Sequence, residues 1–265
     1  GTIRDMAMHN YYLRRFLGEE RTFRAGVVLG VFLLLAMAAV AFLPTAWPVF
    51  PVVTRHAPAL SHHQFVGRLV LYLAFAPLIG GFLAGLDRRI TARLQGRRGP
   101  PLLQPFYDVA KLWGKESIVV RRSQDFYILF FFLFVVLAGA LFFCGSDLLL
   151  LAFALTLAGI FLILAAHKAS SPYSFIGAER ELLQMFAYEP MVLLTAIGFY
   201  MATGSFRVDD IVAHPAHPLK LIPLALGFLY ILEIKFRKSP FDFSTSHHAH
   251  QELVKGITTE FSGRM

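Results

Sequence analysis

Two carboxylates lie within an apolar stretch, where an ionisable side chain needs a partner or a function. Glu181 and Glu189 occur in AERELLQMFAYEPMVLLTAIGFY, eight residues apart, and in a helix this spacing places both toward one face. A charge at membrane depth costs about 2.5–3.5 kcal/mol, so Glu189 is the leading candidate for proton handling, with Glu181 nearer the interface. The alternative is a Glu189 buried structurally against Arg180 or Tyr188. We expect Pro190 to open the helix locally.

Two more carboxylates flank apolar runs. Glu233 ends the last run and stands four residues before Arg237, the favoured order for a helical salt bridge. Asp87 directly follows an earlier run and neighbours Arg88. Each is therefore either part of an ion path or one member of an interfacial ion pair.

The segment KSPFDFSTSHHAHQELVKGITTEFSG combines imidazoles with carboxylates. Its His247, His248 and His250 match no common zinc spacing, so we predict a hydrogen-bonding cluster that titrates near neutral pH rather than a metal site. The single cysteine, Cys144, cannot hold an iron–sulfur cluster, which needs about four ligands. The carboxylates beside the histidines are Asp242, Glu252 and Glu260.

Membrane-spanning helices are the elements that must position these residues. The 265 residues are 56% hydrophobic and 16% charged, whereas soluble domains carry about 25% charged residues. The apolar residues form six runs, and a span takes about 20 residues. We therefore predict an all-α, polytopic transmembrane helix bundle. The runs lie near Phe23–Trp47, Phe65–Gly85, Phe126–Gly145, Asp147–Ala166, Leu183–Thr203 and Pro218–Ile234.

Only Gly145 and Ser146 separate the third and fourth runs. This spacing predicts a tight turn between two helices, although one long broken helix is an alternative. Asp147 follows the turn and is of the type that caps a helix amino terminus.

The basic residues assign the two faces of the membrane. With a cytoplasmic amino terminus, 21 of the 25 Lys and Arg residues lie on the cytoplasmic side, and only Arg55, Arg68, Arg207 and Lys220 lie on the other. This bias follows the positive-inside rule. It also accounts for the net charge of +8 without a nucleic-acid partner.

The longest cytoplasmic segment, LDRRITARLQGRRGPPLLQPFYDVAKLWGKE, runs from Leu86 to Glu116 as a loop. Between Pro105 and Glu116 its apolar residues recur at helical spacing, which predicts an amphipathic interfacial helix. That helix either lies along the membrane or packs on another subunit. Its apolar residues are Phe106, Val109, Ala110, Leu112 and Trp113.

Three segments together resemble one known family. LDRRITARLQGRRGPPLLQPFYDVAKLWGKES resembles the first cytoplasmic loop of the membrane subunit shared by respiratory complex I, where it is the H-type subunit, and the membrane-bound group 4 nickel–iron hydrogenases. SPYSFIGAERELLQMFAYEPMVLL is similar to that family's next loop and helix, and SPFDF with HAHQELVKGITTEFSG to its third loop. The resemblance runs from about Phe65 to Met265.

Within this family the chain looks most like the Ech-type energy-converting hydrogenases. Complex I members usually have an acidic third loop, where this chain has His247, His248 and His250, and the sequence of Gly99–Pro101 is GPP rather than GPN. The resemblance implies a membrane-anchoring, ion-coupling subunit of a ferredoxin-linked hydrogenase that pumps H⁺ or Na⁺. A quinone-chamber subunit of a complex I-like oxidoreductase and a passive membrane scaffold remain alternatives.

The resemblance also implies the surroundings of the chain. The nickel–iron centre and the iron–sulfur clusters would be held by partner subunits, and this chain would bind no cofactor. The expected partners are the hydrogenase large and small subunits and an iron–sulfur subunit on the cytoplasmic face, an antiporter-like membrane subunit, and the lipid bilayer. The location would be the cytoplasmic membrane of a bacterium or archaeon.

Carried over position by position, the resemblance gives two groups of candidate residues and no catalytic residue. The ion-pathway candidates are Asp87, Glu181, Glu189, Glu233, Asp242, Glu252, Glu260, His247, His248 and His250. The candidates for docking the peripheral arm are Arg97, Arg98, Gln104, Arg180 and Gln184.

The resemblance divides the chain in two. Residues 1–60 are an amino-terminal extension with one additional transmembrane helix. Residues 61–265 are the family's membrane domain, which we expect to lack its last helices because the family continues beyond the TEFSG motif.

Overall fold

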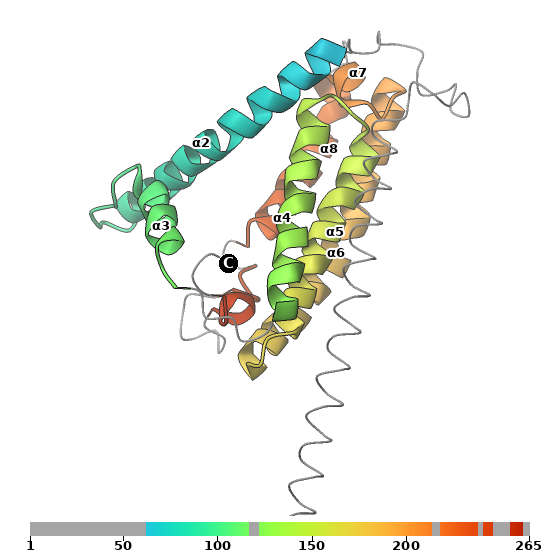
Figure 1. The fold of residues 1–265 in the computed structure, drawn as a ribbon. Coiled ribbons are helices and arrows are strands. Elements are labelled where there is room, and N and C mark those ends of the chain that lie inside the picture. Colours follow the sequence, from blue (N-terminus) through green and yellow to red (C-terminus); the bar gives the residue numbers. More distant parts are fainter. Residues whose placement is uncertain (1–61, 117–121, 214–217, 238–240, 246–254, 262–265) are drawn as a thin grey trace, which may run out of the picture.

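A computed structural model describes residues 62–116, 122–213, 218–237, 241–245 and 255–261. These residues form seven α-helices, α2 to α8, and one short 3₁₀ helix, with no strand among them. Figure 1 shows α4, α5 and α6 side by side, with α2 leaning away from them. The predicted all-helical fold is confirmed for the described part of the chain.

The core of the bundle is the hairpin of α4 (Arg122–Phe143) and α5 (Leu148–His167). The rings of Phe130 and Phe134 both stack on Phe161, at 5.3 and 5.4 Å between centroids. Small residues of α5 let the two backbones approach closely. The buried alanines of α5 that pack in the core shared with α4 are Ala154, Ala158 and Ala165.

The connection between α4 and α5 is the predicted tight turn. Gly145 adopts φ +70°, the left-handed conformation that glycine tolerates best. The Asp147 carboxylate then accepts the backbone N–H groups of Leu149 at 2.7 Å and Leu150 at 3.2 Å. Asp147 is therefore a helix cap, and the broken-helix alternative does not hold.

The third helix of the bundle, α6 (Pro172–Thr203), packs on α5 along one side and on α8 (Pro218–Lys235) along another. Pro190 lies inside α6, which continues through it, so the predicted local opening is wrong. Proline removes one backbone hydrogen bond, and the packing of α6 between α5 and α8 keeps the helix intact. A short helix, α7 (Val208–Ala213), follows α6.

We call the two ends of the bundle the loop end and the turn end. The loop end is where α5 passes into α6 and where residues 241–245 and 255–261 lie. The turn end carries the α4–α5 turn and α7.

Helix α2 (His62–Leu94) is held to the bundle near its beginning, at the turn end. The Tyr72 ring stacks on Phe143 at 5.1 Å, and Arg68 donates to the Asp209 carboxylate at 2.9 and 3.0 Å. The helix then diverges from α4 toward its other end (Figure 1). It continues past Gly85 to Leu94, so the first part of the predicted loop from Leu86 is helical, because Arg and Leu are good helix formers.

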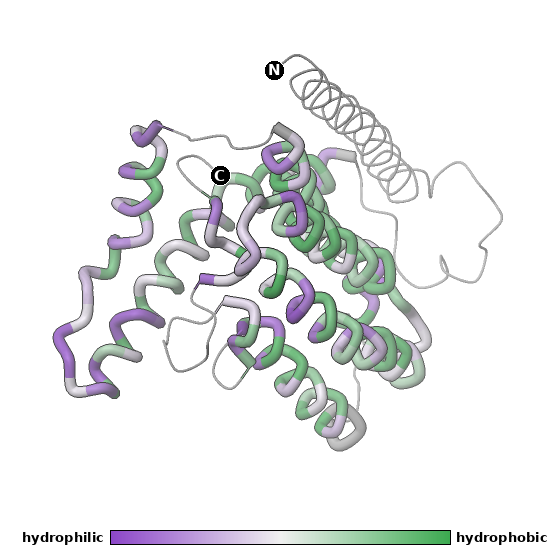
Figure 2. Tube along the Cα trace, turned by 90° about the horizontal axis from the view of Figure 1, so that it is seen from below, coloured by the Kyte–Doolittle hydropathy of each residue, from purple (hydrophilic) through white to green (hydrophobic). Residues whose placement is uncertain are grey.

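The amphipathic helix is α3 (Gln104–Trp113), close to the predicted segment. It packs against α2 at two glycines. A Cβ atom at Gly85 would lie 1.9 Å from the Leu102 carbonyl oxygen, and one at Gly81 would lie 2.5 Å from the Phe106 ring. We call this junction the α2–α3 corner. In Figure 2, α3 alternates hydrophilic and hydrophobic residues, and the turn before it is hydrophilic.

Four described helices, α2, α4, α5 and α6, are long and apolar enough to cross a membrane. Their most apolar windows have mean hydropathies of 1.4 to 2.8. Helix α8, the sixth predicted run, has 18 residues, of which Lys220, Glu233 and Lys235 are charged. The first predicted run, near Phe23–Trp47 within the extension of residues 1–60, lies outside the described residues.

A methyl group at Gly85 should separate α3 from α2. We expect Gly85→Ala to lower the free energy of unfolding by about 1–3 kcal/mol. The new Cβ would overlap the Leu102 backbone, which a change of side-chain rotamer cannot move. Amide hydrogen exchange in α3 should accelerate. Gly80→Ala is the matched control, since nothing lies within 4 Å of its Cβ position. Equal α3 exchange in the two variants would contradict the tight corner.

Candidate functional site

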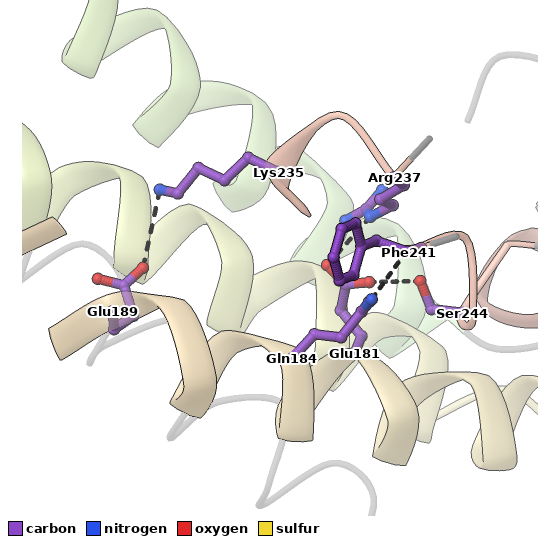
Figure 3. Close-up of polar contacts among 7 residues, drawn as sticks. All are labelled: Glu181, Gln184, Glu189, Lys235, Arg237, Phe241 and Ser244. Atoms are coloured by element: carbon purple, nitrogen blue, oxygen red, sulfur yellow. Dashed lines mark hydrogen bonds and ion pairs between the residues drawn. The ribbon is translucent and has the colours of Figure 1, made fainter. Parts of the chain in front are cut away.

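The first carboxylate of α6 forms a buried ion pair at the loop end. The Glu181 side chain is 6% exposed, and its Oε1 accepts Arg237 Nη2 at 2.6 Å and Nε at 3.0 Å. The Ser244 hydroxyl donates to the other oxygen, Oε2 (Figure 3). Both oxygens therefore have donors, which is the condition for burying a carboxylate.

Arg237 reaches Glu181 because the chain turns immediately after α8. That helix ends at Lys235, and Arg237 takes φ +49°, a left-handed conformation that stops helical continuation. The alternative of a helical salt bridge between Glu233 and Arg237 therefore does not hold, since Arg237 lies beyond the end of α8 and pairs with Glu181. Glu233 itself is exposed.

The second carboxylate, Glu189, lies two turns deeper along α6. Its Oε2 accepts the Thr156 hydroxyl of α5 at 2.7 Å, and Lys235 Nζ of α8 lies 3.8 Å from Oε1. The ammonium also lies 4.8 Å from the centre of the Tyr188 ring. Oε1 is buried and makes no hydrogen bond within the described residues. Glu189 therefore has cross-helix partners rather than Arg180.

The two carboxylates differ in how firmly their charge is balanced. Glu181 accepts hydrogen bonds from two nitrogens of the Arg237 guanidinium and from the Ser244 hydroxyl. Glu189 accepts one hydrogen bond, from the Thr156 hydroxyl, and its lysine partner lies beyond hydrogen-bond distance. Arginine stays protonated in proteins, and lysine can lose its proton when buried. The arrangement therefore holds Glu181 in a closely bonded ion pair, whereas Glu189 is paired only loosely with Lys235.

Residues 241–245 lie against the beginning of α6. The Phe241 carbonyl accepts Gln184 Nε2 at 2.8 Å, and the Phe243 carbonyl accepts Arg180 Nη1 at 3.5 Å. Asp242 is 8% exposed. Two predicted docking residues, Arg180 and Gln184, thus position this segment over Glu181.

Residues 255–261 form a second contact with α6. A Cβ at Gly177 would lie 2.5 Å from the backbone nitrogen of Ile257, which is fully buried. Glu260 accepts the Ser170 N–H at 2.7 Å in the turn between α5 and α6. Glu260 therefore fixes that turn. His247, His248, His250 and Glu252 lie outside the described residues.

The remaining predicted residues gather at the α2–α3 corner. Asp108 accepts Arg88 Nη1 at 2.8 Å and Gln104 Nε2 at 2.9 Å. These two hydrogen bonds, Arg88 first, hold the pKa of Asp108 below its usual value. A lowered pKa means that this contact stabilises the fold above the ordinary aspartate range and is lost only as pH falls through the lowered value.

Asp87, Arg97 and Arg98 lie at the same corner and line one groove. This corner is separate from the α6 carboxylates, so the sequence candidates divide into two places. Among the described residues, no group of three His, Cys, Asp or Glu side chains could hold a metal ion.

Sequence reasoning missed Thr156 and Ser244, and it did not assign Lys235 to Glu189 or Arg237 to Glu181. The available signal was the basic stretch after the last apolar run, since two carboxylates in an apolar helix need cations. Hydroxyl partners give no such signal, because Ser and Thr occur throughout the chain.

The sequence of residues 66–265 matches the family described as NADH dehydrogenase. Hydrogenase-4 component C of Escherichia coli (strain K12) is 32% identical over 216 residues, which are 75% of this chain and 66% of that protein. Formate hydrogenlyase subunit 4 of the same organism is 32% identical over 218 residues, 76% of this chain and 68% of that protein. The H-type subunit of the NADH-quinone oxidoreductase from Ehrlichia chaffeensis is 30% identical over 217 residues, 68% of this chain and 58% of that protein.

A solved structure is also similar, that of the membrane-bound sulfane sulfur reductase, an archaeal respiratory membrane complex. The matched chain has 28% sequence identity and a TM-score of 0.66, over 76% of this chain and 70% of that one. The three curated relatives are longer, and this chain spans 58% to 68% of their lengths.

Neutralising Glu181 should release the segment 241–245. Glu181→Gln leaves Arg237 without its counter-ion, and we expect the free energy of unfolding to fall by about 2–3 kcal/mol. This loss is somewhat smaller than for a fully buried pair, because the Arg237 side chain is 29% exposed. Thermal unfolding of the purified protein in detergent measures this. Glu233→Gln is the control, because Glu233 is exposed. A similar unfolding temperature for both variants would exclude a stabilising role for the Glu181–Arg237 pair.

Proposed function

The chain belongs to the NADH dehydrogenase family, as a membrane subunit of complex I-like redox complexes, and from this premise we propose that it couples an energy-converting nickel–iron hydrogenase to ion translocation. The proposed reaction is ferredoxin-linked evolution or uptake of H₂, with H⁺ or Na⁺ moved across the membrane. The observation that carries the coupling role is Glu189, which is 15% exposed and loosely paired within apolar helices. The names of the two Escherichia coli relatives support the hydrogenase assignment.

The two basic residues at the end of α8 link the loop end to the buried site. Lys235 faces Glu189, and Arg237, two positions later, holds Glu181. Glu181 is also bonded to Ser244 of the segment 241–245 (Figure 3). A displacement of this segment by a bound peripheral arm therefore acts on the same short stretch of chain that presents Lys235.

The proton step follows from the distance between Lys235 and Glu189. A cation close to a carboxylate favours its ionised form, and withdrawal of that cation into another position favours the neutral form. When Lys235 moves away, Glu189 takes up a proton, and when Lys235 returns, Glu189 releases it. Alternation between these two states during turnover moves one proton, and an exit toward a neighbouring subunit gives it a direction.

The chain's partners supply the redox chemistry in this proposal. Hydrogenase large and small subunits and an iron–sulfur subunit bind at the loop end, which we place on the cytoplasmic side because most basic residues lie there. An antiporter-like subunit accepts the ion laterally within the membrane. The nickel–iron centre and iron–sulfur clusters belong to those partners.

A second candidate function is the quinone-chamber subunit of a complex I-like oxidoreductase. The NADH-quinone oxidoreductase relatives from Ehrlichia chaffeensis, at 30% identity, and Thermomicrobium roseum, at 29%, favour it. The third, a passive scaffold, would require the Glu189 environment to be structural only.

The subunits that co-purify with the chain should separate the first two functions. We expect a nickel-containing large subunit and hydrogen evolution with reduced ferredoxin as the electron donor. The measurement is mass spectrometry of the purified complex together with its metal content. Bound quinone, with turnover blocked by quinone-site inhibitors, would instead support the second function.

Replacement of Glu189 should uncouple redox turnover from ion movement. We expect Glu189→Gln to lower proton or sodium uptake by about 10²-fold or more, on the scale of a lost proton-transfer group, in vesicles that hold the assembled complex. Glu179→Gln is the matched control on the same helix, since the Glu179 side chain is 47% exposed. Undiminished pumping in an assembled Glu189→Gln complex would exclude this residue from the path and favour the scaffold.

A further inference from the structure

The end of α2 and the turn that follows it form a basic groove that the proposed coupling role does not use. Its volume is about 380 Å³, and its lining includes Asp87 and Thr91 of α2. Three arginines face the same groove, with one acidic residue opposing them. These arginines are Arg88, Arg97 and Arg98.

The arginines keep donors for a ligand after their own contacts are made. Arg88 uses Nη1 for Asp108, and Arg97 uses Nη2 for the side chain of Gln95. A guanidinium has five N–H donors in a planar fork, which suits two oxygens of a phosphate or carboxylate. The groove therefore has the charge and the geometry for an anionic group with several oxygens.

The surface beside the groove indicates what that anionic group is attached to. Phe75, Ile79 and Leu83 precede Asp87 along α2 at steps of four residues, so they form one ridge that ends at the groove. Their exposed fractions are 53%, 56% and 55%. Because α2 is apolar and long enough to cross a membrane, this exposed ridge is suited to contact acyl chains next to the arginines.

We propose that this groove binds the phosphate headgroup of an anionic phospholipid, with an acyl chain along the ridge of Phe75, Ile79 and Leu83. Basic pockets at the membrane interface bind such headgroups through arginine and lysine. The occupant is a lipid rather than an acidic protein surface because the arginine cluster continues directly into an exposed apolar ridge. Such a lipid would lie against α2 at the corner where Arg88 and Asp108 join it to α3.

The test measures which lipids stay with the purified membrane complex. The complex is reconstituted in vesicles of phosphatidylcholine that contain phosphatidylglycerol as the minor component, extracted in mild detergent, and analysed for bound lipid by mass spectrometry. We expect the Arg97→Gln/Arg98→Gln variant to lower the ratio of retained phosphatidylglycerol to phosphatidylcholine roughly tenfold. Arg97→Lys/Arg98→Lys keeps the positive charge but loses the planar N–H donors of the guanidinium, so its ratio of phosphatidylglycerol to phosphatidylcholine should be intermediate.

Arg93→Gln/Lys115→Gln is the matched control, because it removes two nearby charges that do not line the groove. Its lipid ratio should equal that of the unchanged protein. An equal loss in this control would mean general surface attraction and would overturn the site. The site would also be overturned if Arg97→Gln/Arg98→Gln left the lipid ratio unchanged but released the peripheral subunits, which would assign the arginines to protein docking.

Excess inorganic phosphate during extraction distinguishes a lipid from a free anion. A lipid held also by its acyl chain should stay bound in phosphate. Complete displacement of phosphatidylglycerol by phosphate would make the groove a simple phosphate site and overturn the role of the ridge.

Discussion

The buried ion pair between Glu181 and Arg237 is the interaction on which the loop end depends. A carboxylate with 6% exposure is tolerable only with its charge balanced and its oxygens hydrogen-bonded, and Arg237 and Ser244 meet both conditions. The same contacts tie the end of α8 and the segment 241–245 to α6. The position of Lys235, and with it the environment of Glu189, follows from where Arg237 is held.

The chain therefore consists of two differently built parts. In the bundle of α4, α5, α6 and α8, polar pairs cross between helices within a packed apolar core. In α2 and α3, glycines at Gly81 and Gly85 allow close backbone contact, and Arg88 with Asp108 holds the corner from outside. The first part contains the ionisable site, and the second presents charge and apolar surface to its surroundings.

The sequence allowed prediction of what depends on local pattern. The length of the apolar runs predicted the bundle helices, and Gly145 with Asp147 predicted the turn and its cap. The helical spacing of apolar residues predicted α3. The end of α2 was missed, because hydropathy reports where the membrane run stops and not where the helix stops, and Arg88 to Leu94 are compatible with helix. The effect of Pro190 was overestimated for a related reason, since packing against α5 and α8 outweighs a single missing hydrogen bond.

The candidate carboxylates could be found from sequence, but their partners could not. Glu181 is bonded to residues 56 and 63 positions away, and Glu189 to Thr156, 33 positions away. Nothing in local spacing distinguishes Arg237 from Lys235 as the partner of Glu181. That choice is made by the left-handed turn at Arg237, a backbone feature that its own residue type does not favour.

The Arg68–Asp209 pair fixes α2 to the bundle near the beginning of the helix. It fastens the helix near one end, while the other end carries α3 and the groove. From Arg68 to Leu94 the helix is about 39 Å long, at about 1.5 Å per residue. A tilt of about 5° around the pair would therefore move the Leu94 end of the helix by about 3 Å. A rotation of α2 about this pair would thus displace the helix more at its Leu94 end than near Arg68.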